Sequence, residues 1–331
     1  MTLAASYPWH GEHWRRIVQA RAQGRLPHAI LLTGPVGLGK SVFARRLGDS
    51  LVCVKTDELG DACGCCPSCR TAQAGTHPDQ RFVKPEEPGR NIRIDAVREL
   101  TANSVLSASE GAYRVFVIDP ADAMNNAAAN ALLKTLEEPC SKTVLILVSS
   151  RPDCLAPTIR SRCQLLKFVT PSWGEARAWL TKQGIDTDID ELLAISGGAP
   201  LRALLAKEQA WLEESHRLGQ ELLTLKHRKI NPLSRVEEWE KRPLHLLSDS
   251  LKRCLSDLVK LASGLRDETI YHPGMRADLQ CLGEGIDLRM LYGFNDEVLR
   301  LDREASNNLN VQMQLEFIVN RWLQITRPGG R

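Results

Sequence analysis

The sequence contains no apolar run near the roughly 18 residues that a membrane-spanning helix needs, so it predicts no such helix. Its first residues carry Tyr7, Trp9 and His10 where a secretory signal peptide would have an apolar core, so we expect a cytoplasmic protein. Internal repeats and low-complexity segments are also missing. The formal net charge is only +3, which is typical of a mixed, solvated surface and does not by itself indicate a nucleic-acid partner. No stripe of aromatic and basic residues marks a DNA-binding surface.

The chain has 331 residues, 43% of them hydrophobic, which predicts two or three domains with a sizeable core. Up to residue 168, short apolar runs alternate with helical patterns, and this alternation predicts a parallel sheet covered on both faces. The predicted strands are Ala29–Thr33, Arg81–Lys84, Arg114–Ile118, Thr143–Ser149 and Cys163–Phe168. The predicted helices between them are Ser41–Val52, Asp95–Ser104 and Ala127–Glu138.

After Pro171 the pattern becomes helical only. Short helices are predicted over Ser172–Gln183 and Asp188–Ile195 and from Leu201 onward. From about residue 210, apolar residues recur at helical spacing, which favours either an oligomerisation domain or a plain helical bundle. We therefore predict domains at 1–169, 170–209 and 210–331. The prediction of a helical domain at 210–331 rests on two apolar helix faces. One consists of Leu247, Leu251, Cys254, Leu255, Leu258 and Val259, and the other of Leu315, Ile318, Val319 and Trp322.

A phosphate-binding loop is indicated directly after the first predicted strand. Gly34, Gly37, Gly39, Lys40 and Ser41 fit the pattern G-x-x-x-x-G-K-S without a mismatch, and a predicted helix follows. The glycines allow backbone N–H groups to turn toward phosphate oxygens, and the helix N-terminus adds its dipole. Lys40 would reach the β- and γ-phosphates, and Ser41 would ligate Mg²⁺. The sequence thus predicts an ATP/Mg²⁺ site, with a relic loop that no longer binds nucleotide as the alternative.

The acidic partners of this loop are incomplete. Asp119 ends a predicted strand, where a P-loop protein places the carboxylate that holds the Mg²⁺ water shell. The next position often carries a glutamate that polarises the attacking water, but here it is Pro120. Asp122 is shorter than glutamate and three residues further on, and we expect it to cap a helix. The sequence therefore predicts nucleotide binding without hydrolysis.

Five of the ten cysteines fall between residues 53 and 69, and in a reducing compartment such a cluster indicates metal binding. Cys53, Cys63, Cys66 and Cys69 supply four thiolates, with two overlapping C-x-x-C turns. Four thiolates with no open position predict a structural Zn²⁺ site that stabilises a short insertion. Cys65 neighbours Cys66 and is expected to be a free thiol.

His77 is a competing candidate ligand. Its surroundings, Gly75-Thr76-His77-Pro78-Asp79, are typical of a turn that leads into the next strand, which favours a structural histidine. The remaining cysteines are scattered and are expected to be buried, inert thiols. They are Cys140, Cys154, Cys163, Cys254 and Cys281.

The order of the motifs resembles a known family. The motifs are Tyr7-Pro8-Trp9, the P-loop, the cysteine module, Ala74–Asp79, Ile94–Leu100, Asn130–Pro139 and Ser161-Arg162-Cys163. In this order they are similar to bacterial clamp loader subunits, most closely to the delta' family of DNA polymerase III. The resemblance covers residues 7–169 densely. Further on, Asn308–Trp322 is similar to the last helix of the family's collar domain.

The resemblance implies a RecA-like AAA+ module with a zinc insertion, a small helical lid and an all-α collar. It further implies a pentameric ring with gamma/tau motor and delta subunits, which uses ATP to load the sliding clamp onto primed DNA. The complex would belong to a polymerase holoenzyme, a nucleotidyltransferase. In the family, the arginine of Ser-Arg-Cys reaches the ATP site of the next subunit, and here that is Arg162. A guanidinium suits a γ-phosphate chemically, while a surface ion pair is the alternative.

Two departures from the family's motor subunits stand out. Pro120 interrupts the acidic pair, and Leu201 occupies the place of an arginine, with Arg202 one residue late. Both fit a subunit that does not hydrolyse ATP by itself. The alternative is a gamma/tau-type motor ATPase, which Pro120 disfavours, as does the lack of an extension after Arg331 for contacting polymerase. A small-molecule P-loop kinase would leave residues 210–331 and the cysteine module without a role.

Overall fold

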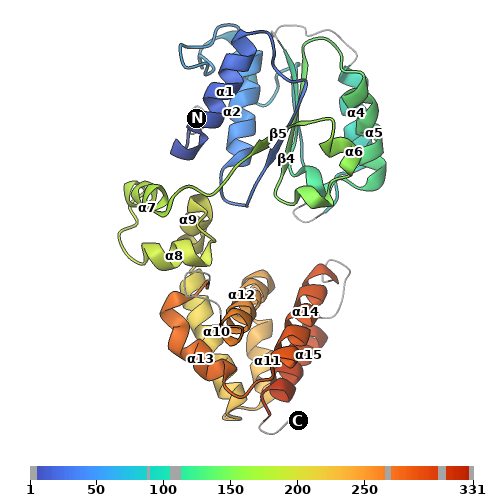
Figure 1. The fold of residues 1–331 in the computed structure, drawn as a ribbon. Helices are drawn as coiled ribbons and strands as arrows, with labels where there is room; N and C mark the ends of the chain where they lie inside the picture. The colour runs from blue at the N-terminus through green and yellow to red at the C-terminus, as the bar shows by residue number, and fades with distance from the viewer. Residues whose placement is uncertain (1–5, 88–89, 105–112, 265–269, 305–310, 328–331) are drawn as a thin grey trace. The chain divides into compact units, whose positions relative to one another are not determined.

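The computed structural model describes residues 6–87, 90–104, 113–264, 270–304 and 311–327. The chain divides into two compact units, Met1–Pro171 and Ser172–Arg331 (Figure 1). The first unit is built on a parallel sheet, and the second unit, where it is described, consists of helices. Residues 308–310 of the predicted last helix lie outside the described residues.

The sheet of the first unit has five parallel strands in the order β2-β3-β4-β1-β5. This confirms the predicted parallel sheet, and each end of β2 and β5 differs by one residue from the prediction. The strands are β1 (Ala29–Thr33), β2 (Gln80–Val83), β3 (Arg114–Ile118), β4 (Thr143–Ser149) and β5 (Gln164–Lys167). The residues of β1, β3 and β4 are all buried, as expected for strands covered on both faces.

Helices cover both faces of this sheet (Figure 1). On one face lie α1 (Gly11–Ala22) and α2 (Lys40–Val52), and on the other lie α4 (Ile94–Ser104), α5 (Asn126–Glu137) and α6 (Pro157–Arg160). Alternate residues of the strands point toward α4, α5 and α6 and pack with residues of these helices. The strand residues are Ala29, Leu31, Phe116, Ile118, Leu145 and Leu147, and the helix residues include Val97, Leu132 and Ile159. A short helix, α3 (Pro67–Gln73), lies in the cysteine segment, and 3-10 turns span Pro8–His10, Ala121–Ala123 and Pro152–Cys154.

Among its described residues, the second unit has two apolar cores. Helices α7 (Trp173–Lys182), α8 (Ile189–Ile195) and α9 (Pro200–Glu208) share one core with Trp211. The other core is formed by α10 (Trp211–Lys226), α11 (Pro232–Glu240), α12 (Leu244–Ala262), α13 (Arg276–Gly283), α14 (Leu288–Glu304) and α15 (Val311–Ile325). Both predicted apolar faces, on α12 and α15, contribute to it. Trp322 is fully buried there, and its indole N–H donates to the Leu222 carbonyl at 3.0 Å.

Candidate nucleotide site and cysteine centre

The phosphate-binding loop lies where sequence reasoning places it, between β1 and α2. Gly34, Gly37 and Gly39 have positive φ values of 136°, 86° and 78°, which side-chain-bearing residues rarely adopt. A Cβ on Gly34 would lie 2.2 Å from the carbonyl oxygen of Phe168, so the loop approaches the end of β5 too closely for any other residue. The loop therefore has the glycine-dependent shape of a phosphate cradle, at the carboxyl ends of the parallel strands.

Lys40 is buried at the base of this loop, and Ser41 is exposed in the first turn of α2. The Lys40 ammonium donates to the carbonyls of Gly34 and Pro35, each at 2.7 Å, and to the Ser150 hydroxyl at 3.0 Å. Burial lowers the pKa of Lys40, and the negative charges of Asp119 and Asp122 oppose this shift. The arrangement brings the predicted lysine together with the predicted Mg²⁺-binding aspartate.

Asp122 does not cap a helix, so that prediction was wrong. Its Oδ1 accepts from the Ser149 hydroxyl at 2.7 Å and from the Ser150 N–H at 3.3 Å, and its Oδ2 accepts from Arg151 Nε at 3.1 Å. The cap of α5 is Asn125, whose side chain accepts from the Ala128 N–H at 2.8 Å. The prediction failed because the strand order that places β4 beside β3 is not visible in the local sequence.

An aromatic wall flanks the loop, and sequence reasoning missed its contact with the cradle. The rings of Tyr7 and Trp9 stack with centroids 5.1 Å apart. Trp9 Nε1 donates to the carbonyl of Leu38 at 2.9 Å, and His10 Nε2 lies 2.7 Å from the same oxygen, so it is the protonated nitrogen. A Cβ on Gly39 would lie 2.6 Å from the Tyr7 ring. The Tyr-Pro-Trp motif therefore supports the loop in addition to serving as a family signature.

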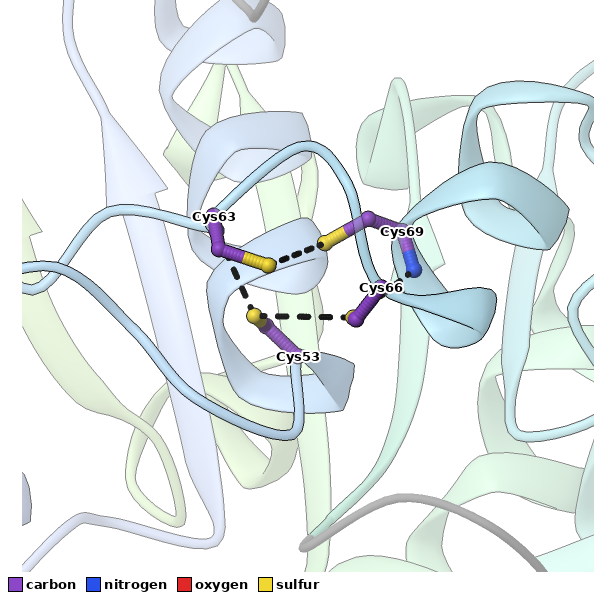
Figure 2. A group of neighbouring side chains, drawn as sticks. All are labelled: Cys53, Cys63, Cys66 and Cys69. Atoms are coloured by element: carbon purple, nitrogen blue, oxygen red, sulfur yellow. Dashed lines mark hydrogen bonds between the residues drawn. The ribbon is translucent and has the colours of Figure 1, made fainter.

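The four predicted cysteine ligands converge (Figure 2). The sulfurs of Cys53, Cys63, Cys66 and Cys69 all lie within 4.8 Å of one another. The Cys53–Cys66 and Cys63–Cys69 sulfurs are 4.0 and 3.9 Å apart. A tetrahedral zinc–thiolate centre with bonds of about 2.3 Å needs sulfurs about 3.8 Å apart, so the four residues can hold a metal ion of this kind.

Backbone N–H groups support the same sulfurs. The Cys63 N–H donates to Cys53 Sγ at 3.3 Å, and the Cys69 N–H donates to Cys66 Sγ at 3.4 Å, which also caps α3. Backbone hydrogen bonds from Cys65 and Cys66 lower the pKa of Cys63 to about 6, whereas burial raises the pKa of Cys69. A bound cation would supply the positive charge that keeps all four sulfurs ionised.

Neither His77 nor Cys65 belongs to the group of four converging sulfurs, although Cys65 Sγ lies 3.6 Å from Sγ of Cys63. His77 is buried, and its Nδ1 accepts from the Asp79 N–H at 3.0 Å, so it has the structural role that the turn sequence predicts. Cys65 is exposed, as expected for a free thiol. Among the scattered cysteines, Cys254 is buried as predicted, but Cys154 and Cys281 are exposed. That part of the prediction was wrong because these two residues lie at a 3-10 turn and on the outer face of α13.

The cysteine module is attached to the helices that carry the nucleotide loop. Arg46 of α2 forms a bidentate pair with Asp61, with N–O distances of 2.5 and 2.6 Å. The same guanidinium lies 3.8 Å from the ring centroid of Trp14 on α1. Trp14 Nε1 donates to the Leu59 carbonyl at 2.9 Å. The insertion thus contacts α1 and α2 through specific polar groups as well as through its cysteines.

Arg162 follows α6 and is exposed. Its guanidinium pairs with Glu137 at 2.7 Å and donates to the Thr158 carbonyl at 3.0 Å. Glu137 is half exposed, so the pair is a surface contact that another partner can replace at low energetic cost. In the second unit, Arg202 lies over the ring of Trp211, 5.3 Å from its centroid.

A parallel sheet whose first strand leads through a G-x-x-x-x-G-K-S loop into a helix defines the P-loop class of α/β proteins. The profile of the family described as "DNA polymerase III, delta subunit" matches residues 9–172. DNA polymerase III subunit delta' of Pseudomonas aeruginosa is 35% identical over 332 residues, covering 99% of this chain and 100% of that protein. The chain therefore belongs to the delta' family of DNA polymerase III subunits.

Two further relatives extend the comparison. DNA polymerase III subunit delta' of Bacillus subtilis is 28% identical, covering 89% of this chain and 90% of that protein. DNA polymerase III subunit gamma/tau of Mycobacterium tuberculosis is 32% identical over 193 residues, covering 56% of this chain and 33% of that protein. Within the described part of the chain, no helix is long and apolar enough to cross a membrane.

Proposed function

We propose that this chain is a delta'-type clamp loader subunit that helps to load the sliding clamp onto primed DNA during chromosomal replication. It acts in the cytoplasm, in a pentameric ring with gamma/tau-type motor subunits and a delta subunit. Its sheet and P-loop correspond to the AAA+ module, residues 170–209 to the lid, and residues 210–331 to the collar that joins the subunits. Family membership and the helical structure of the second unit's described residues support this assignment.

The P-loop binds Mg·ATP in this proposal but does not hydrolyse it. The backbone N–H groups around Gly34, Gly37 and Gly39 surround the phosphates, Lys40 contacts the β- and γ-phosphates, and Ser41 and Asp119 hold Mg²⁺. The lack of hydrolysis in this proposal rests on the hydrogen bonds that Asp122 already makes. Both of its carboxylate oxygens already accept hydrogen bonds, and Pro120 has no carboxylate to offer.

In this proposal, the subunit contributes one catalytic group to the ring: Arg162 acts in trans on the ATP bound by a neighbouring motor subunit. Its exposure and its weak surface pairing with Glu137 support this role, because the guanidinium can leave Glu137 without exposing a buried charge. A planar, permanent positive charge near the γ-phosphate stabilises the charge that develops during phosphoryl transfer.

The cysteine module holds one structural Zn²⁺ in the proposal, bound by Cys53, Cys63, Cys66 and Cys69. The donor set supports this assignment, since four thiolates at tetrahedral spacing leave no position open for substrate. When bound, the ion links the end of α2 to the start of α3. The chain's own groups orient the ligands through the N–H···S hydrogen bonds.

The finger role is tested by Arg162→Ala in a reconstituted clamp loader, with Arg160→Ala as the matched control. Arg160 lies two residues away, is partly exposed and pairs with Asp153 at 3.1 Å. We expect Arg162→Ala to slow the ATP turnover of the assembled loader while Arg160→Ala leaves it unchanged. Equal turnover for the wild type and Arg162→Ala would remove the finger role.

Nucleotide binding is tested on the isolated chain by titration with a fluorescent ATP analogue in the presence of Mg²⁺. We expect saturable binding that is lost in Lys40→Ala, together with background ATP hydrolysis by both proteins. Lys40-dependent turnover by the isolated chain would instead favour the gamma/tau-type motor, and equal binding by both proteins would identify a relic loop.

A further inference from the structure

The cysteine segment contains one thiol that the four-ligand centre does not use. Cys65 is exposed, and its Sγ lies 3.6 Å from Sγ of Cys63, one of the four ligands. Only Gly64 separates the two residues, and its φ of +73° turns the chain so that both side chains project to the same side. A ligand sulfur is therefore in van der Waals contact with a thiol that solvent can reach.

We propose that Cys63 and Cys65 form an oxidation site at which a hydroperoxide produces a disulfide and releases the metal. The proposal rests on the zinc assignment made above and adds a chemical response to that site. The reactive partner is a small oxidant of the hydroperoxide class, which needs access to one sulfur only.

The reaction proceeds in two steps that balance. Cys65 sulfur attacks the O–O bond of the hydroperoxide, which yields a sulfenic acid and, from hydrogen peroxide, one water. The Cys63 thiolate then attacks the Cys65 sulfur, forming the S–S bond and expelling hydroxide, which takes up a proton to become a second water. Two sulfurs have supplied the two electrons that reduce the peroxide. A metal ion held by the four sulfurs would lose Cys63 as a ligand in the second step.

The geometry favours Cys65 over the ligands as the entry point. Cys53 and Cys69 are buried and Cys63 and Cys66 are partly exposed, so Cys65 is the most accessible of the five sulfurs to an oxidant in solvent. Once Cys63 is in the disulfide, three thiolates remain on an ion that structural sites hold with four. Within the part of the chain that the structure describes, only these four cysteines lie close enough together to share an ion, so His77 offers no replacement. Metal release is the expected consequence.

The experiment uses the purified full chain, kept reduced and then freed of reductant. Zinc content is measured first by atomic emission. Hydrogen peroxide is then added, and zinc release is followed with a chromophoric chelator. Differential alkylation and mass spectrometry of the tryptic peptide over residues 56–70 locate the new disulfide. The test variant is Cys65→Ser, and the matched control is Cys154→Ser, which removes another exposed cysteine of the first unit.

We expect the wild type and Cys154→Ser to release zinc together with formation of the Cys63–Cys65 bond. Cys65→Ser should hold the same amount of zinc before oxidation and release it about tenfold more slowly, because the remaining sulfurs are ligands or lie elsewhere. Release from Cys65→Ser at the wild-type rate overturns the proposal, and so does a disulfide that joins other cysteines. A freshly purified wild type without zinc refutes the metal assignment instead, and the peptide map then decides separately whether the Cys63–Cys65 bond forms.

Discussion

The ion pair between Arg46 and Asp61 should be a principal attachment of the cysteine module to α2, and Asp61→Asn tests it. The substitution keeps the size and one hydrogen-bond acceptor but removes the charge. It leaves the Arg46 guanidinium, whose side chain is only 10% exposed, against the Trp14 ring without a counter-charge. Removing one partner of a fully buried pair costs about 3–5 kcal/mol, and an exposed pair contributes about 0–1 kcal/mol.

Asp61 lies between these limits, because its side chain is 25% exposed and water reaches the site. We therefore expect Asp61→Asn to lower the stability of the first unit by about 2 kcal/mol. For a unit of this size that loss corresponds to a decrease of about 4–8 °C in the midpoint of its unfolding transition.

The assay is thermal unfolding of the full chain, followed by circular dichroism at constant zinc concentration. Asp153→Asn is the matched control, since it makes the same chemical change in a pair whose carboxylate is 95% exposed. The control should shift the midpoint by no more than the equivalent of about 0.5 kcal/mol. If the two variants unfold at the same temperature, the pair does not attach the module, and the energetic argument fails.

Three further substitutions test the effects of burial and close packing. Burial lowers the pKa of His10 to about 4 from 6.5, so the unfolded chain binds a proton at this histidine before the folded chain does as the pH falls. This histidine should lower the free energy of unfolding by about 2 kcal/mol between neutral pH and pH 5. His10→Gln should lose that part of the pH dependence, as measured by denaturation at the two pH values. Gly34→Ala combines a strained positive φ with a backbone clash and should lower the free energy of unfolding by more than about 3 kcal/mol. The control Gly24→Ala also has a positive φ but no atom within 4 Å of the new Cβ, so it should lower that free energy by about 1 kcal/mol. Chemical denaturation measures both. Asp257 is fully buried and accepts hydrogen bonds from two backbone N–H groups and from His272 Nδ1 at 2.8–3.0 Å. Asp257→Asn should therefore lower the urea midpoint of the second unit by the equivalent of about 2–3 kcal/mol. An unchanged midpoint would contradict the burial argument.

The sequence predicted the sheet and the loop well because both depend on local signals. Continuous apolar runs mark strands buried on both faces, and the spacing of Gly34, Gly39 and Lys40 is dictated by phosphate geometry. The cysteine cluster was equally predictable, since all four cysteines fall within a short segment. Helices α1 and α3 were not predicted, because α1 mixes aromatic and charged residues and α3 begins only at Pro67, with Cys66 as its cap.

Apart from the exposure of Cys154 and Cys281, the errors and omissions concern contacts between segments that are distant in the sequence. Asp122 meets Ser149 and Ser150 because β3 and β4 are neighbours in the sheet. Tyr7 meets Gly39 because the chain before α1 passes over the loop. Neither pairing leaves a periodic or compositional signal, so a single sequence predicts the groups but not which groups meet. The division of the second unit into lid and collar and the role of Arg162 stay predictions.

The two glycines at the ends of the phosphate loop have a further consequence for its thermodynamics. Gly34 packs closely against the backbone of Phe168 and Gly39 against the ring of Tyr7, so both ends of the loop are held by packing contacts. A loop held in this way has little conformational freedom to lose when a ligand arrives. Nucleotide binding should then carry only a small entropic penalty from loop ordering, and hydrogen exchange should show nearly the same protection of the loop before and after binding.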